Sequence, residues 1–198
     1  MRFFCLILFF RLAAVRGQQY EYEASFNFGQ YGKWNNYTYD NSSLFYKVGY
    51  KAFEFSFGMN RVSKNSTFIN SIDLKYSFTT DGYHYLVIPF KTGLVLGGEK
   101  VEFVPNIGVY NTTPLTNRIN ELGLYWEGTK RYFILGLLFS SELRLRLKNR
   151  SSLSLELEYR RDLTSSYTER QGSSGGCCFP QKVRTKMTNI GINYVFNF

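Results

Sequence analysis

Apolar and polar residues alternate one by one along most of this chain, and no other feature limits its possible folds as strongly. In residues 20–28 every even position is apolar or aromatic, whereas the odd positions between them are Glu, Ser or Asn. Successive side chains of a β-strand point to opposite faces, so this period of two predicts a strand with one apolar face. The pattern recurs in residues 53–59, 68–78, 86–96, 101–109, 133–147, 153–159 and 190–198. The chain is therefore predicted to be all-β, with about eight antiparallel strands.

The second face of these strands carries charges of both signs. In the predicted hairpin after residue 133, one face holds Glu142, Arg144, Arg146, Glu156, Glu158 and Arg160. We expect Arg144 and Arg146 to neutralise Glu156 and Glu158 across the hairpin. Other strands add Glu21, Glu23, Glu54, Asp73, Lys75, Lys91 and Glu102. These residues are predicted to form an interior polar network, because charged side chains are costly on a lipid-facing surface.

The composition favours apolar faces that are turned outward to lipid. Aromatic residues make up 19% of the 198 residues, but hydrophobic residues only 44%, and the mean hydropathy is -0.25. Membrane barrels place Tyr, Phe and Trp in girdles at the lipid headgroups. A sheet in hydrocarbon must also close, so that no edge N–H or C=O group is left unpaired. The prediction is a closed antiparallel up-and-down transmembrane β-barrel, and with about eight strands its interior is filled by side chains.

The chain is predicted to have one folded domain behind a leader. Residues 1–17 combine a charged start, a short apolar run and small residues, as a cleaved signal peptide does. Residues 18–198 then form the outer-membrane β-barrel domain of a Gram-negative bacterium. Long outer connections are expected at 30–43, 112–130 and 164–184, with short turns at the other end. Because residues 46–50 have the opposite parity to 53–59, a bulge is expected near Lys51.

Four segments combine this alternation with short motifs. They are YLVIPFK at 85–91, VPNIGVY at 104–110, LELEYR at 155–160 and IGINYVFNF at 190–198. Together they resemble strands of PorT-like outer-membrane barrels, over roughly the half of the chain that follows Tyr83. The resemblance implies an outer-membrane location and, for PorT itself, a part in a secretion system. The last segment is similar to the assembly signal that the barrel insertion machinery reads, with Tyr194, Phe196 and Phe198 as its signal residues.

No catalytic, metal-binding or cofactor-binding constellation stands out in the sequence. His84, the one histidine, shares the parity of the outward Leu86 and Ile88, so an interfacial ring explains it better than catalysis. The adjacent pair Cys177 and Cys178 has no further ligands at metal-site spacing. The formal charge of +9 is scattered over the strands, so nucleic acid is not an expected partner.

Three functions remain open at this point. The first is a non-enzymatic barrel with a structural or secretion-assisting role, which contacts outer-membrane lipid and lipopolysaccharide. The basic loop residues expected to meet lipid phosphates are Lys130, Arg131, Arg170, Lys182 and Arg184. The second is a lipid-modifying barrel enzyme that uses His84 with a Ser and a carboxylate. The third is a soluble, lipocalin-like carrier, which requires apolar faces turned inward and an interior free of the charges named above.

Overall fold

The computed structural model describes residues 19–39, 42–63, 67–80, 82, 84–115, 127–130, 133–147, 151–164, 167–170 and 180–196. The predicted signal peptide at 1–17 lies outside these residues, as do Cys177, Cys178 and Phe198. No helix in the described ranges is both long enough and apolar enough to span a membrane.

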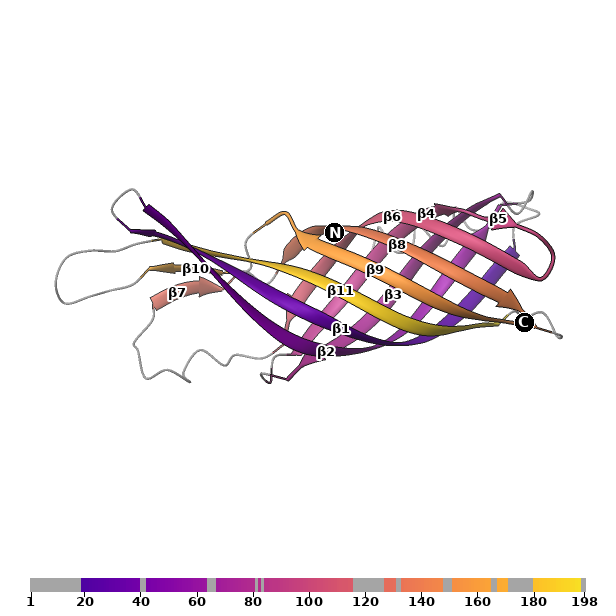
Figure 1. Cartoon of the computed structure of the whole chain (residues 1–198), viewed down its shortest axis with the longest axis horizontal. Helices are drawn as coiled ribbons and strands as arrows, with labels where there is room; N and C mark the ends of the chain where they lie inside the picture. Colours follow the sequence, from indigo (N-terminus) through magenta and orange to yellow (C-terminus); the bar gives the residue numbers. More distant parts are fainter. Residues whose placement is uncertain are drawn as a thin grey trace, which may run out of the picture.

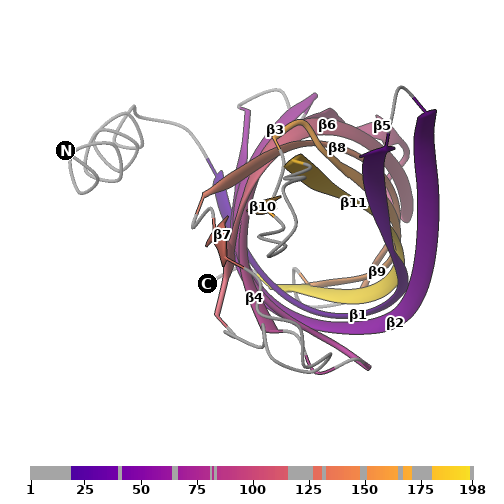
Figure 2. The same cartoon turned by 90° about the vertical axis from the view of Figure 1, so that its left-hand side faces the viewer.

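Eight long antiparallel strands form a closed wall (Figures 1 and 2). They are β1 (Gln19–Tyr39), β2 (Ser42–Val62), β3 (Phe68–Thr79), β4 (His84–Leu94), β6 (Val101–Pro114), β8 (Ile134–Arg146), β9 (Ser152–Asp162) and β11 (Pro180–Phe196). Each strand pairs with the next long strand in the chain, and β1 closes the ring by pairing with β11 over fifteen residue pairs. The prediction of a closed up-and-down barrel of about eight strands is confirmed.

The two ends of the barrel differ. At the near end, where residues 19 and 196 lie, short connections join β2 to β3, β4 to β6, and β8 to β9. One of these contains the two-residue strand β5 (Leu96–Gly97), and Gly97 has a φ of 133° that favours glycine. At the far end, β3 and β4 are joined by a brief turn in which the Gly82 N–H donates to the Thr79 carbonyl at 2.9 Å.

Alternation in the sequence becomes alternation in burial. Along β9, Ser154, Glu156, Glu158 and Arg160 are buried, whereas the leucines between them are exposed. Four leucines decide the orientation of the wall, because Leu143, Leu145, Leu153 and Leu155 are 44% to 52% exposed. The leucines of this hairpin therefore point outward to the surrounding medium, and most of its charged side chains point into the lumen. The lipocalin-like hypothesis required the reverse and is wrong.

Several strands continue beyond the far end of the wall, where long loops were expected. β1 and β2 pair without interruption to Tyr39 and Ser42, so residues 30–43 are almost entirely strand, and there is no bulge near Lys51. Two short strands, β7 (Glu127–Lys130) and β10 (Tyr167–Arg170), occupy parts of the other two expected loops. The order β2, β1, β11, β10, β7 makes a projecting sheet, which extends to the left in Figure 1. The β2–β3 pairing ends at Ala52 and Thr79, so this sheet stands beyond the closed wall.

Two prolines, Pro89 and Pro105, lie in the middle of wall strands. Pro105 faces Ser141 in an unbroken β6–β8 ladder. Pro89 is different, because the β3–β4 ladder skips its position and resumes between Lys75 and Val87. Proline has no N–H to donate, so it removes a ladder hydrogen bond at this place.

Candidate functional site

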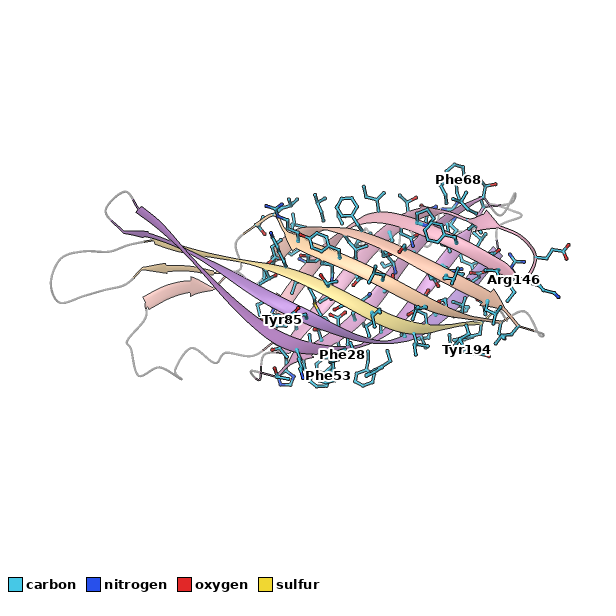
Figure 3. The ribbon with its side chains drawn as sticks, in the orientation of Figure 1. Phe28, Phe53, Phe68, Tyr85, Arg146 and Tyr194 are labelled. Carbon is cyan, nitrogen blue, oxygen red and sulfur yellow. The ribbon has the colours of Figure 1, made fainter. Side chains whose placement is uncertain are left out.

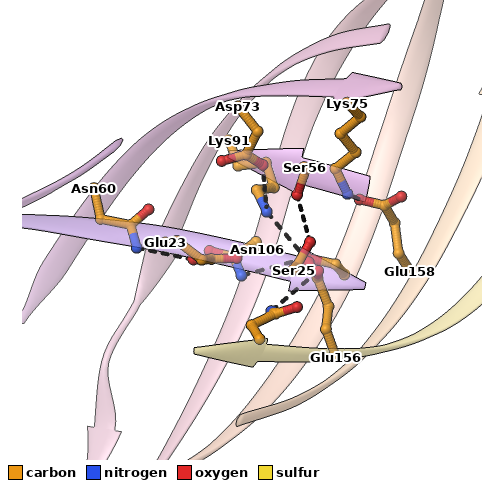
Figure 4. Close-up of polar contacts among 12 residues, drawn as sticks. Glu23, Ser25, Ser56, Asn60, Asp73, Lys75, Lys91, Asn106, Glu156 and Glu158 are labelled. Carbon is orange, nitrogen blue, oxygen red and sulfur yellow. Dashed lines mark hydrogen bonds and ion pairs between the residues drawn. The ribbon is translucent and has the colours of Figure 1, made fainter. Parts of the chain in front are cut away.

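The lumen contains a network of buried ion pairs that joins strands from around the ring (Figure 4). The Lys75 Nζ donates to Glu158 Oε2 at 2.7 Å, which links β3 to β9. The Lys91 Nζ lies 3.0 Å from Asp73 Oδ2 and 3.2 Å from Glu156 Oε1, so β4 binds β3 and β9 at once. All five side chains are at least 96% buried. Such pairs are tolerated only where geometry and hydrogen bonds offset the loss of hydration.

Arg160 organises the part of the network nearer the far end. Its guanidinium donates to Glu54 across the lumen, and its Nε lies 3.1 Å from Glu158 Oε1. Asn189 donates from Nδ2 to Glu54 Oε2 at 2.9 Å. The Tyr110 ring lies 5.8 Å from the guanidinium carbon, close enough for a cation–π contact.

Arg144 organises the part nearer the near end. Its Nη2 donates to Glu142 Oε2 at 2.8 Å and its Nη1 donates to Glu21 Oε2 at 3.0 Å. Arg146 has a side chain that is 50% exposed and pairs with Glu102 at the rim, where Figure 3 labels it.

The expected pairing of Arg144 and Arg146 with Glu156 and Glu158 is therefore wrong. Register explains the difference, because Glu142 and Glu156 occupy directly opposite positions of the β8–β9 hairpin. The arginine partners come from β1, β6 and the same strand instead. In a narrow closed barrel, side chains from non-adjacent strands are close enough to compete with neighbours in one hairpin.

Carboxylates outnumber cations among the described buried residues. Eight acidic side chains are buried, namely Glu23, Glu54, Asp73, Glu102, Glu142, Glu156, Glu158 and Asp162. Four basic ones accompany them: Lys75, Lys91, Arg144 and Arg160. Complete mutual neutralisation by these buried side chains, as expected from the sequence, is therefore not available.

Inward glycines make room for the polar side chains. Five of them lie directly opposite a buried polar residue on the neighbouring strand: Gly29 with Asn189, Gly58 with Asp73, Gly93 with Asn106, Gly136 with Tyr110, and Gly191 with Asn27. A Cβ at Gly191 would lie 1.5 Å from Asn27 Oδ1, and one at Gly136 would lie 2.1 Å from the Tyr110 ring. The opposing side chain therefore occupies the space that a Cβ would take. This arrangement was missed from the sequence, although all five glycines lie at the parity of the charged face.

Apolar side chains occupy the lumen on either side of the network. Val62, Ile69 and Val104 cluster near the near end. Toward the far end lies a second buried cluster, which consists of Ala52, Tyr85, Val87, Tyr110, Leu138 and Met187. A cavity between this cluster and the Glu54–Arg160 pair has a volume of about 30 Å³, room for about two water molecules. The described side chains thus leave little space in this part of the lumen.

Aromatic rings cover the outward face of β1 to β4. Phe28, Phe53 and Phe78 form one row across three strands, in which adjacent ring centroids are 5.2 Å apart (Figure 3). His84 continues this row at the far end, where its Nδ1 hydrogen-bonds the Tyr76 hydroxyl at 2.5 Å. The histidine therefore points outward, as its parity predicted, and packs among rings.

The predicted assembly-signal residues lie at the closing strand. Tyr194 is outward and 46% exposed, and its ring centroid is 6.1 Å from that of Phe196. Phe196 in turn lies 6.0 Å from Tyr22 of β1, across the closure of the barrel. Among the described residues, no group of three or more His, Cys, Asp or Glu is arranged to hold a metal ion.

Comparison with known proteins identifies the architecture. No protein-family model and no curated protein sequence matches the chain. Its structure is similar to the outer membrane protein OprG from Pseudomonas aeruginosa, with a TM-score of 0.55 and 13% identity over 92% of this chain and 97% of that one. Neisserial surface protein A (TM-score 0.49, 9% identity, 92% and 100% coverage) and the outer membrane enzyme PagL (0.49, 10%, 89% and 99%) are also similar. The chain has the fold of the small eight-stranded outer-membrane β-barrels.

Proposed function

We propose that this protein is an integral, non-enzymatic barrel of a bacterial outer membrane, which carries its projecting sheet on a filled and non-conducting wall. The observation that carries the proposal is the lumen itself, in which ion pairs bridge strands from opposite sides of the ring. A solute would have to displace these pairs and leave charges buried without partners, which is costly.

The projecting sheet supports a role in contact with other molecules. It extends β1, β2 and β11 beyond the wall and adds β7 and β10. Within it, β2 lies at an edge, since β3 has already ended. Edge strands offer unpaired N–H and C=O groups to a partner strand. The secretion-assisting role implied by the PorT-like resemblance is consistent with such a platform, and the insertion machinery and lipopolysaccharide are further proposed partners.

Conductance and heat modifiability test the filled wall together. The purified protein is expected to shift its gel mobility on boiling, as folded barrels do, and to give no stable conductance steps in planar bilayers. A double variant, Glu54→Ala with Arg160→Ala, removes the pair next to the cavity and serves as the positive control for the recording. Stable steps from the unmodified, heat-modifiable barrel would contradict the proposal.

The role of the projecting sheet is tested separately. Residues 33–48 of the β1–β2 hairpin are replaced by a four-residue Gly/Ser turn, which keeps the pairing from Gly32 and Gly49 downward. The shortened protein is expected to remain heat-modifiable but to give the same pattern of secreted proteins as a strain without the gene. A secretion pattern equal to that of the unmodified strain would exclude a secretion-assisting role for the projecting sheet.

The enzymatic role considered from the sequence uses His84, and PagL is an outer membrane enzyme with a similar fold. Here the ring is engaged by Tyr76 and Phe78 on the outward aromatic face. We expect His84→Ala to leave the lipid composition of the membrane unchanged, as measured by mass spectrometry.

A further inference from the structure

One edge of the projecting sheet is open along β2. The β2–β3 ladder ends at Ala52 and Thr79, whereas β2 continues beside β1 as far as Ser42. In the described part of the chain, β2 pairs with β1 and β3 alone. Residues 43–51 therefore have β1 on one side and no described strand on the other, in the hairpin drawn in indigo at the left of Figure 1.

A single hydrogen bond shows which backbone groups face the open side. The Thr80 N–H donates to the Lys51 carbonyl at 2.9 Å, so the polar backbone groups of Lys51 point away from β1. In an antiparallel ladder, alternate residues direct their N–H and C=O groups to the same side. The β1–β2 register runs without a break from Lys51 to Ser42. The residues whose N–H and C=O groups face the open side are therefore Ser43, Phe45, Lys47 and Gly49.

This row of backbone groups is a template for another strand. A long and regular strand edge pairs readily with an added chain. A proline would interrupt the template because it has no N–H, but the sequence contains none between residues 42 and 51. In such pairing the backbone hydrogen bonds supply affinity, and the side chains of the added strand supply specificity.

The sequence around this edge is basic. Residues 24–53 contain three lysines and one acidic residue, Asp40. Residues 182–185 of β11, which pair with β1, add two basic residues and no acidic one. Opposite charges on neighbouring strands attract each other, and like charges repel. An added strand that carries carboxylates is therefore favoured over a basic one.

The same charge disfavours a second copy of this edge as the occupant. Lysines on edge strands act against pairing between identical edges, because such pairing brings like charges together. Lys47 and Lys51 both belong to the open stretch, which contains no acidic residue. Specificity arises in this way when repulsion of one partner accompanies attraction of another.

We propose that the open edge of β2 binds an extended, acidic segment of another protein, which joins the projecting sheet as a further strand. The inference rests on the proposed function, since it names the partner chemistry of the sheet that the barrel carries. It assigns binding to the backbone of residues 43–49 and selection to the surrounding basic residues.

The test is a titration of the detergent-solubilised barrel with fluorescently labelled nine-residue peptides, followed by anisotropy. One peptide alternates Thr with Glu, and the second has Lys in place of each Glu. The Glu peptide is expected to bind saturably, and the Lys peptide at least about tenfold more weakly. Phe45→Pro removes one N–H from the open edge and is expected to raise the Kd of the Glu peptide at least about tenfold. The matched control, Phe45→Ala, keeps this N–H and is expected to change the Kd by no more than about threefold.

Three outcomes would overturn the edge site while the barrel remains heat-modifiable. The first is no saturable binding of the Glu peptide, and the second is equal binding of the two peptides. The third is an equal Kd for Phe45→Pro and Phe45→Ala, which would show that the backbone edge is not used. The proposed function fails separately, if the protein is not heat-modifiable or if the shortened hairpin leaves secretion unchanged.

Discussion

Replacing Lys75 with Met is expected to destabilise the barrel more than replacing its partner Glu158 with Gln. The reason is the charge balance of the lumen, where eight described buried carboxylates face four buried cations. Loss of Lys75 raises the carboxylate excess from four to five, whereas loss of the Glu158 charge lowers it to three. Removal of Lys75 therefore increases the excess negative charge in the lumen, whereas removal of the Glu158 charge decreases it.

The size of the difference follows from the contacts. Removal of one partner of a buried ion pair costs about 3–5 kcal/mol. After Lys75→Met, Glu158 keeps Arg160 at 3.1 Å, so we expect a loss near the lower limit, about 3 kcal/mol. Glu158→Gln keeps an amide oxygen beside the Lys75 Nζ and is expected to cost about 1 kcal/mol.

Urea unfolding in lipid vesicles, followed by gel mobility, measures both free energies on one scale. The double variant Lys75→Met with Glu158→Gln completes the cycle, and its loss should be smaller than the sum of the single losses, because the first change already removes the interaction. A loss for Glu158→Gln that equals or exceeds the loss for Lys75→Met would refute the argument from charge balance.

Two other predictions concern the glycine pairs and the closing strand. Gly191→Ala should lower the free energy of unfolding by about 1–3 kcal/mol, because the new Cβ collides with Asn27 Oδ1. Gly98→Ala is the control: no atom lies within 4 Å of its Cβ position, so it should leave the free energy unchanged in the same urea series. Equal losses for the two variants would contradict the steric explanation. Phe196→Ser should lower the yield of heat-modifiable barrel in an assembly assay, because it removes the ring that packs on Tyr22, whereas Phe103→Ser serves as an outward control and equal yields would count against the signal.

The wall was predictable because lipid and lumen impose the same period of two on every strand. A shift of one residue in β9 would turn Glu156 and Glu158 toward lipid and bury the leucines beside them. Alternation therefore indicated about eight strands, while the charged faces and the aromatic composition indicated which face of each strand points outward.

The partners inside the lumen were not predictable in the same way. Sequence reasoning paired Arg144 with Glu156 and Glu158. Arg144 instead contacts Glu142 of its own strand and Glu21 of β1, which is 123 residues away. Contacts of the second kind depend on closure of the ring, and neighbouring strands in sequence do not reveal it. The pairing of Gly191 with Asn27 has the same origin, since β1 and β11 meet only when the barrel closes.

The projecting sheet was misread for a physical reason. Residues 30–43 were expected to be a long outer connection. Beyond the last β3 pair there is no contrast between lipid and lumen, so a strand needs no alternation there. Backbone pairing alone continues the β1–β2 hairpin to Tyr39 and Ser42.

The interrupted β3–β4 ladder has a consequence for the stability of the wall, because it makes the junction between these two strands the weakest. The closure between β1 and β11 consists of fifteen consecutive residue pairs. In contrast, β3 and β4 share nine pairs, which are split into two blocks around Pro89. Because each block can separate without the other, we expect the barrel to open first between β3 and β4, and not at the closure between β1 and β11.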